Sequence, residues 1–276
     1  VPLKRDTNRL IFGGTMLQVR NERGTLVYSK IKSKEASEKI VYNTLTVPVR
    51  ERFQLVLADG TKVFLNSGSE MRYPERFGKA RREVFLKGEA WFEVAKDSAR
   101  EFWVHAGAMD VKVLGTSFNV KAYERLETVA TTLVEGSVEV ACAGKSFQIV
   151  PGEQFVYDKN NRVMDVRMVD TESYVSWKDG YYKFRQTTLE EIMETLSVWY
   201  GLNVFYVNES AKQVEFTGKV RRYEDARMLL DKFEQTGDVV FDIKGNNVFI
   251  TIKQKKPFAR EWNSFLVKAR GMVWQS

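Results

Sequence analysis

The fold is decided by residues 53–120, which contain the runs Leu55-Val-Leu-Ala-Asp-Gly-Thr-Lys-Val-Phe-Leu65, Val84-Phe-Leu-Lys-Gly-Glu-Ala-Trp-Phe-Glu-Val94 and Val111-Lys-Val-Leu-Gly-Thr-Ser-Phe-Asn-Val120. Each run has a short apolar alternation, then a glycine, then a second alternation. Val, Phe, Leu and Thr favour a pleated, half-buried strand, and glycine accepts backbone angles that bulkier residues resist. Each run therefore predicts a strand, a tight turn or arc, and a second strand.

The same design continues in Thr132-Leu-Val-Glu-Gly-Ser-Val-Glu-Val140 and Gln148-Ile-Val-Pro-Gly-Glu-Gln-Phe-Val156. A degenerate internal repeat of strand pairs is typical of stacked, solenoid-like β coils or of a compact β roll. The one cysteine, Cys142, cannot form an internal disulfide and is expected to be a small strand residue.

A second pattern begins near Asp170. Thr188 and Glu191 have the spacing of a capping box, an apolar stripe follows, and Gly201 stands where a left-handed C-terminal cap is wanted. A second helix is expected over residues 226–233. Strands are predicted at residues 177–184, 203–207, 214–220, 239–243 and 248–252, which gives the order βαβ-βαββ of a small α+β domain.

The sequence thus predicts a mainly β protein with a smaller α+β domain. A β domain covers residues 1–170, of which 1–47 are the least decipherable, although 15–19 and 25–28 are typical of a strand pair. The α+β domain covers residues 171–252. Residues 30–39 are expected to form a charged loop, and residues 253–276 form a basic tail whose apolar residues at helical spacing are Phe258, Trp262, Phe265 and Leu266.

Composition excludes several functional classes. The formal charge is +7, but six basic residues and one acidic residue lie from Lys253 onward, so the excess is terminal rather than on a folded face, and nucleic-acid binding is disfavoured. No window approaches the roughly 18 apolar residues of a membrane span. The start of the chain also lacks the apolar core of a signal peptide.

Catalytic and metal-binding chemistry finds no support. One histidine, His105, and one cysteine leave too few ligands for a zinc site and no general base beside a nucleophile. Each glycine of the repeated runs precedes a strand rather than a helix, which is the wrong context for a phosphate loop. Glu89 and Glu93 are about 13 Å apart on one strand, too far for a glycosidase pair, and are expected on a solvated face. We therefore predict no enzyme, no cofactor and no metal.

With catalysis, metal binding and nucleic-acid binding disfavoured, binding to another protein is the remaining class of function. An exposed sheet edge allows such binding, because a partner strand can form main-chain hydrogen bonds with it. The strand at residues 214–220 lacks an obvious hairpin partner before it, although it can also pair within its own sheet. The candidate partner-binding residues are Val214, Phe216, Thr217 and Gly218.

The chain resembles the FecR-type anti-sigma factors in the form common among Bacteroidetes. The resemblance rests on six segments: Leu57-Ala-Asp-Gly-Thr-Lys-Val-Phe-Leu-Asn66, Tyr73-Pro-Glu-Arg-Phe77, Val84-Phe-Leu-Lys-Gly-Glu-Ala-Trp-Phe-Glu-Val-Ala-Lys-Asp97, Val113-Leu-Gly-Thr-Ser-Phe-Asn-Val120, Thr132-Leu-Val-Glu-Gly-Ser-Val138 and Pro151-Gly-Glu-Gln154. Residues 189–200, with Phe216-Thr-Gly218, are similar to the C-terminal domain of those proteins, a relative of the short N-terminal signalling domain of secretins and TonB-dependent transporters.

The resemblance implies the periplasmic sensor region of a protein anchored in the inner membrane. Such proteins hold an extracytoplasmic-function (ECF) sigma factor through a cytoplasmic segment and read the signalling domain of an outer-membrane TonB-dependent transporter. The cytoplasmic segment and the membrane helix are expected to lie outside the matched residues. The family has no short catalytic motif, so the resemblance assigns no site residues.

A carbohydrate-binding β module without catalysis is the alternative hypothesis. Trp91, Trp103, Tyr73 and Phe92 would be its aromatic platform. Alternation along a strand places Trp91 and Phe92 on opposite faces, so at most one of them can join such a platform. An enzyme and a nucleic-acid-binding tail rank below both hypotheses.

Overall fold

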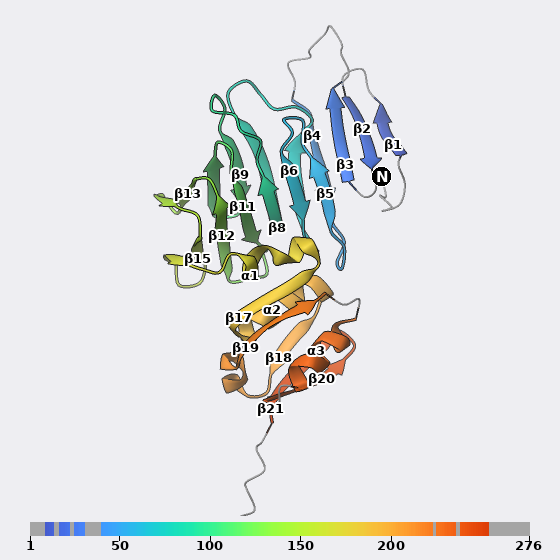
Figure 1. Cartoon of the computed structure of the whole chain (residues 1–276), viewed down its shortest axis with the longest axis vertical. Coiled ribbons are helices and arrows are strands. Elements are labelled where there is room, and N and C mark those ends of the chain that lie inside the picture. The colour runs from blue at the N-terminus through green and yellow to red at the C-terminus, as the bar shows by residue number, and fades with distance from the viewer. Residues whose placement is uncertain are drawn as a thin grey trace, which may run out of the picture.

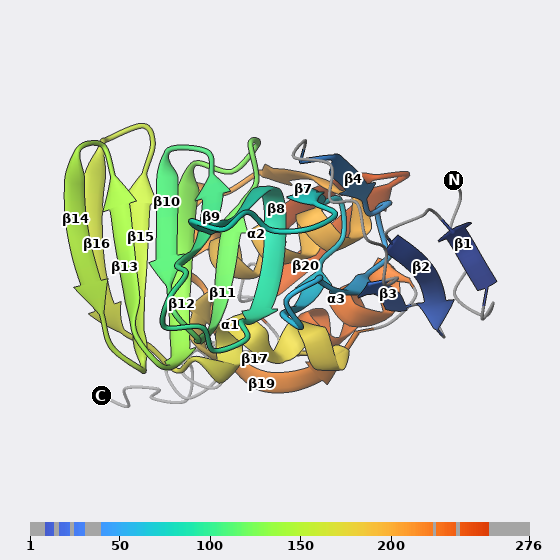
Figure 2. The same cartoon turned by 90° about the horizontal axis from the view of Figure 1, so that it is seen from above.

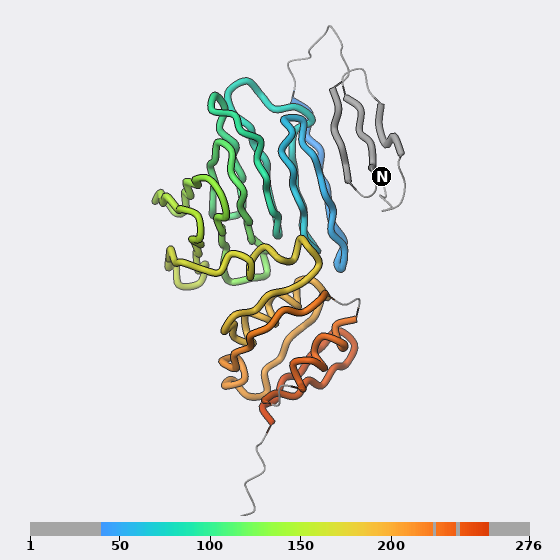
Figure 3. The backbone as a smooth tube through the Cα atoms, viewed as in Figure 1, coloured from blue at the N-terminus to red at the C-terminus, as the bar shows by residue number. Residues whose placement is uncertain are grey.

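A computed structural model of the chain describes residues 9–13, 17–22, 25–30, 40–222, 225–235 and 238–253. Within them a β-rich part, which we call the roll, lies above a smaller α+β unit (Figure 1). Figure 3 traces the chain through both parts and shows that it crosses between them once, along the segment before the strand Tyr181–Thr188, labelled β17 in Figure 1. The predicted fold class, a mainly β part followed by a smaller α+β part, is confirmed.

The roll holds sixteen strands in one continuous hydrogen-bonded network within the described residues. They are β1 (Arg9–Gly13), β2 (Leu17–Glu22), β3 (Thr25–Lys30), β4 (Tyr42–Thr46), β5 (Phe53–Val56), β6 (Lys62–Leu65), β7 (Glu70–Pro74), β8 (Arg82–Glu93), β9 (Phe102–Ala106), β10 (Met109–Val113), β11 (Ser117–Ala122), β12 (Thr128–Glu135), β13 (Val138–Cys142), β14 (Lys145–Ile149), β15 (Glu153–Asp158) and β16 (Val163–Met168).

Two layers of strands share β8. One layer runs β1-β2-β3-β5-β6-β8-β11-β12-β15-β16 and the other β4-β7-β8-β9-β10-β13-β14 (Figure 2). All pairs are antiparallel except β3·β5 and β8·β9, so the arcs form a roll of two facing layers rather than coils of parallel strands. The apolar residues between the layers form one core cluster.

Glycine explains how β8 serves both layers. Residues 82–87 pair with β7 and β9, and residues 88–93 pair with β6 and β11. Gly88 lies at the change of layer with φ +107°, and a Cβ there would lie 2.4 Å from the Ser69 hydroxyl. Only glycine fits both the angle and the close approach. The predicted arc is thus a bend inside one long strand.

The α+β unit spans residues 172–252, and from its first strand onward it has the predicted order β-α-β, β-α-β-β. Its two sheets are β17–β19 and β18–β21–β20, in which β18 runs parallel to β21, and one core cluster joins both sheets with α2 and α3. Its elements are α1 (Glu172–Val175), a 3-10 turn (Ser176–Asp179), β17 (Tyr181–Thr188), α2 (Leu189–Tyr200), β18 (Asn203–Tyr206), a 3-10 turn (Glu209–Gln213), β19 (Glu215–Arg221), α3 (Ala226–Gln235), β20 (Val239–Lys244) and β21 (Asn247–Ile252).

The caps predicted for α2 are confirmed. The Thr188 hydroxyl accepts from the Glu191 N–H at 3.3 Å, and Gly201 has φ +69°. The strand predicted from Trp177 is wrong at its start, because Gly180 (φ +87°) ends a 3-10 turn that buries Trp177 and β17 begins only at Tyr181.

Of the other local predictions, two are confirmed, two fall outside the described residues and one is not tested. The predicted strand pair near the N-terminus is β2–β3, and Cys142 is buried in β13. The predicted charged loop, except Lys30, and the tail stripe lie outside the described residues. The boundaries at residues 170 and 252 stay a prediction, since Trp91 of the roll belongs to the core cluster of the α+β unit.

Candidate functional site

The predicted partner-binding residues lie on β19 and just before it. Among the described residues β19 pairs only with β17, so its second edge has no strand beside it. Val214 precedes β19, and its carbonyl accepts from the Leu189 N–H at 2.7 Å, which fixes the start of α2. The geometry is that of an edge strand, and the partner-binding role of these residues stays a prediction.

The candidate residues divide into structural and surface positions. Phe216 is buried, and its ring meets that of Phe233 edge-on at 4.9 Å. Thr217 is exposed, and its hydroxyl accepts from the N–H of Gln186, which has φ +47° at a bulge in β17. Gly218 is exposed, with open space around an added Cβ. Thr217 and Gly218 are therefore the positions that a partner can reach.

Basic side chains lie at the C-terminal end of this edge, and the exposed Glu215 lies at its start. Lys219 lies over the Tyr181 ring at 3.7 Å and 3.8 Å from the Glu172 carboxylate, and Arg221 is exposed. Glu172 also pairs with Lys183 at 2.5 Å, and this hydrogen bond holds the pKa of the Glu172 carboxyl below its usual value. The C-terminal end of the edge therefore favours a partner whose facing surface is acidic.

The roll caps the C-terminal end of α2. The last carbonyls of a helix lack intrahelical donors and need partners from elsewhere. Here the Ser67 hydroxyl lies 3.2 Å from the carbonyl oxygens of both Val198 and Trp199, and the Arg50 N–H donates to Trp199 at 3.2 Å. The Arg52 guanidinium donates to the Lys178 carbonyl. The α+β unit is thus held to the roll by directional bonds.

A buried carboxylate lies at the centre of this junction. Glu89 is 8% exposed, and its two oxygens accept from the Asn66 side-chain amide at 2.7 Å and from that of Asn119 at 2.9 Å. The Asn119 oxygen in turn accepts from the Trp177 indole N–H at 3.2 Å. Glu89, Asn119 and Trp177, which we call the junction relay, connect β8 to the α+β unit.

The expectation that Glu89 and Glu93 share a solvated face is wrong for Glu89. Glu93 keeps 38% of its side chain exposed and pairs with Lys62, whereas Glu89 is covered by the second unit. Burial raises the pKa of the Glu89 carboxyl, and the Lys121 charge and the two amides oppose that effect. Burial likewise raises the pKa of Tyr123, whose hydroxyl donates to the Ser67 carbonyl at 2.8 Å.

Replacing Asn119 by Leu is expected to lower the free energy of unfolding by about 2–4 kcal/mol at neutral pH, because the Trp177 N–H and one Glu89 oxygen lose their partners in a buried site. A carboxyl with a raised pKa binds its proton more tightly in the folded state, so its contribution falls as pH rises from the usual carboxyl range through the raised pKa. Losing a donor raises that pKa further.

The loss caused by Asn119→Leu should therefore be larger at neutral pH than in acid. Urea titrations of parent and variant at several pH values measure it. The exposed Asn203, changed to Leu, is the control. An equal loss at every pH would contradict the role assigned to Glu89.

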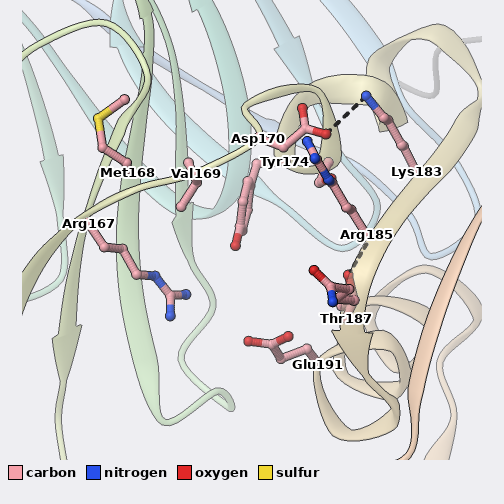
Figure 4. Close-up of a pocket in the computed structure, with 11 residues that line it drawn as sticks. Arg167, Met168, Val169, Asp170, Tyr174, Lys183, Arg185, Thr187 and Glu191 are labelled. Atoms are coloured by element: carbon pink, nitrogen blue, oxygen red, sulfur yellow. Dashed lines mark hydrogen bonds and ion pairs between the residues drawn. The ribbon is translucent and has the colours of Figure 1, made fainter.

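A cleft of about 690 Å³ opens where the end of β16 faces the bulge of β17. Arg167 and Glu191 point into it from opposite walls (Figure 4). On its rim Lys183 pairs with Asp170 at 3.0 Å and thereby joins β17 to the connecting segment. Some of the charged side chains that line this cleft thus form ion pairs that hold the α+β unit against the roll.

The described residues give little basis for a metal site, for catalysis by His105 or for a membrane-spanning helix. No group of three His, Cys, Asp or Glu side chains in them is placed to hold a metal ion. His105 lies in β9, with its Nδ1 2.7 Å from Asp110. None of the helices in the described part of the chain combines the length and hydropathy needed to cross a membrane.

Comparison with known families matches both parts of the chain. The model described as "FecR protein" matches residues 43–139, and that described as "FecR, C-terminal" matches residues 181–250. The chain belongs to the FecR family of anti-sigma factors. The match to this family includes the turn at Asp59 in the first model and β19 in the second.

Two solved structures of a candidate anti-sigma factor from Parabacteroides distasonis ATCC 8503 resemble this FecR-family chain. The structure at 1.65 Å is 27% identical, with a TM-score of 0.70, and the match covers 77% of this chain and 100% of the other. The structure at 2.50 Å is also 27% identical, with a TM-score of 0.69 and coverage of 78% and 100%. The search of curated proteins found no match.

Membership gives this FecR-family chain a regulatory role. The family consists of signalling regulators rather than enzymes, and its members interact with a sigma factor and a receptor. Sequence reasoning located the edge strand but missed the junction relay, because no local pattern marks a carboxylate that a later segment covers. The one local sign of the relay in the sequence is the position of Glu89, directly after Gly88, where β8 passes from one layer to the other.

Proposed function

We propose that this chain is the periplasmic sensor region of a transmembrane anti-sigma factor anchored in the inner membrane. It relays a signal from an outer-membrane TonB-dependent transporter to an ECF sigma factor by protein–protein contact. The proposal is supported by the match to both FecR models and by the free edge of β19 in the part that matches the C-terminal model.

The free edge supplies the physical means of contact. An extended partner segment can add a strand to such an edge through main-chain hydrogen bonds, while its side chains choose the register. The exposed Thr217 and Gly218 lie at mid-strand, and Lys219 and Arg221 add positive charge at one end. The transporter's N-terminal signalling domain, presenting an acidic edge, is the partner proposed for it.

The junction relay offers a route from that edge to the roll. Within the described residues β17 is the one strand that pairs with β19, and the 3-10 turn before β17 carries Trp177. Trp177 in turn bonds Asn119, which holds Glu89 on β8. A shift of β17 on partner binding would therefore act on a strand that belongs to both layers of the roll.

Replacing Gly218 by Glu is expected to weaken binding to the signalling domain about tenfold or more, because a carboxylate next to Lys219 would repel the acidic edge proposed for the partner. Stability should hardly change, since Gly218 is exposed, an added Cβ meets nothing within 4 Å, and its φ is not positive. Titration calorimetry and thermal melting measure the two effects.

Gly78, changed to Glu, is the matched control, because an added Cβ there meets only ordinary contacts and Gly78 lies in the roll. Unchanged affinity in the Gly218 variant would place the contact elsewhere. A lower melting temperature would mean that Gly218 serves the fold instead.

The carbohydrate-binding alternative loses its platform. Trp91, Tyr73 and Phe92 are 4%, 2% and 0% exposed, so their rings pack inside the protein. Trp91 and Phe92 do take opposite faces and belong to different core clusters. Trp103 alone is partly exposed, beside His105. No sugar-binding surface is built from the four residues.

A further inference from the structure

The three-stranded sheet β18–β21–β20 has an uncovered apolar face. Its inner face belongs to the core of the α+β unit, through residues such as Val248 and Ile250. Strand alternation turns Phe205, Phe249 and Val240 to the opposite face. Phe205 is 46% exposed, Val240 36% and the following Val207 62%, so the face presents large apolar side chains to solvent.

These side chains are neighbours. The rings of Phe205 and Phe249 stack with centroids 5.1 Å apart, and the Phe249 ring lies 5.5 Å from the Lys244 ammonium. In the next row Val240 pairs with Thr251 at the C-terminal end of β21. We call Phe205, Val207, Val240 and Phe249 the outer patch. Asp242, which faces Phe249 from β20, pairs with Lys244 at 2.8 Å and lies at the margin of the patch. The described residues leave Phe205, Val207 and Val240 exposed, and exposed apolar patches mark contact surfaces.

The chain leaves the sheet beside the outer patch. β21 is the central strand and ends at Ile252, and the described residues end at Lys253. Residues 254–276 follow, and their sequence carries an apolar stripe at helical spacing: Phe258, Trp262, Phe265 and Leu266. Pro257, just before this stripe, is a residue favoured at the first position of a helix.

The length of the connecting chain and its covalent attachment favour residues 254–276 over a separate molecule as the occupant of the outer patch. The four residues 253–256 can reach at most about 14 Å, whereas neighbouring strands are about 4.8 Å apart, so the stripe can return over any of the three strands. A short tether also gives an effective concentration in the millimolar range, well above that of a second copy in dilute solution.

We propose that the outer patch is the docking surface for residues 254–276 of the same chain, through the stripe Phe258, Trp262, Phe265 and Leu266. The five lysines and arginines from Lys255 to Arg270 then keep their charges on the solvent side of the segment. This proposal does not depend on the proposed function, and it leaves the edge of β19, on the other sheet, free for a partner.

Cysteine labelling tests the proposal in the full chain. The native Cys142 is 2% exposed and serves as a silent background. Val240→Cys is the reporter on the outer patch, and Val163→Cys, at a site 57% exposed on the roll, is the reporter away from it. A thiol reagent is applied to each reporter in the parent tail and in a tail carrying Trp262→Ser with Phe265→Ser.

The tail variant should label Val240→Cys at least about fivefold faster than the parent tail, while Val163→Cys labels equally in both. Arg260→Ser with Ser264→Ala, which alters polar tail positions, is the matched control and should leave the rate unchanged. The protection should also be the same after a tenfold dilution of the protein.

Two results would overturn the proposal. Equal labelling of Val240→Cys with the parent and altered tails would show that the tail does not cover the patch. Protection that disappears on dilution would assign the patch to a contact between two copies of the chain.

Discussion

Ile192→Asp is expected to unfold the α+β unit. Ile192 is fully buried on α2, within the core cluster that joins both sheets of this unit. A carboxylate placed there has no cation or hydrogen-bond donor to compensate its lost hydration, which costs several kcal/mol. We expect the free energy of unfolding to fall by at least about 4 kcal/mol, in the range of the most damaging single substitutions.

Circular dichroism and limited proteolysis measure the effect. The helical signal should fall, and cleavage should appear within residues 181–250 at concentrations of protease that leave the parent intact. Glu191→Asp, which puts the same side chain at the exposed neighbouring position, is the control and should behave like the parent. A variant that melts like the parent would contradict the assignment of α2 to the core.

Asp59→Ala is expected to destabilise the roll by about 3–5 kcal/mol, the cost of leaving one member of a buried ion pair alone. The Arg82 side chain is 0% exposed and that of Asp59 6%, with 2.8 Å between Arg82 Nη1 and Asp59 Oδ2. Arg82 also donates to the carbonyls of Ala95 at 2.8 Å and Arg100 at 2.9 Å. Its charge therefore stays buried among carbonyls when the carboxylate is removed.

The same substitution also releases the turn between β5 and β6. Asp59 accepts from the Thr61 N–H at 3.0 Å and from the Thr61 hydroxyl at 2.7 Å, and Gly60 has φ +89° in this turn. Urea unfolding followed by tryptophan fluorescence measures the loss. Glu124→Ala, which removes the exposed pair with Lys87, is the control and should leave the midpoint unchanged. A midpoint for Asp59→Ala equal to that of the control would contradict this account.

The sequence predicted the parts of the fold that rest on local patterns. Thr188, Gly201 and the stripe between them specify α2 without help from distant residues, and both caps are present. The strand–glycine–strand runs gave the β character of the roll and the arc at Gly88. These features follow from side-chain period and from backbone angles, which act within a few residues.

Features that depend on distant contacts could not be read in this way. Glu89 lies on a strand whose neighbours alternate, yet it is buried because Trp177 and the α+β unit cover that side of β8. Arg82 carries no local mark of burial, since its partners lie in the turn at Asp59 and in the loop that holds Ala95 and Arg100. Trp177 was assigned to a strand because a 3-10 turn has too few residues to show a period.

For β19, the sequence predicted that the strand lies at a sheet edge, but it did not predict which of its residues are exposed. The missing hairpin partner before it was visible in the sequence, and the structure pairs it with β17 alone among the described residues. Its four candidate residues were not separable by sequence, whereas the structure buries Phe216 and leaves Gly218 open. Which residues face a partner depends on packing against Phe233, far along the chain.

Titration calorimetry of the full chain against the N-terminal signalling domain of the TonB-dependent transporter proposed as its partner tests the central claim most directly. The account predicts saturable binding with the parent and with Gly78→Glu, and binding weakened about tenfold or more with Gly218→Glu. Absence of heat with the parent at concentrations far above the micromolar range would contradict a relay through this domain. Equal affinity for all three proteins would contradict the edge of β19 as its contact.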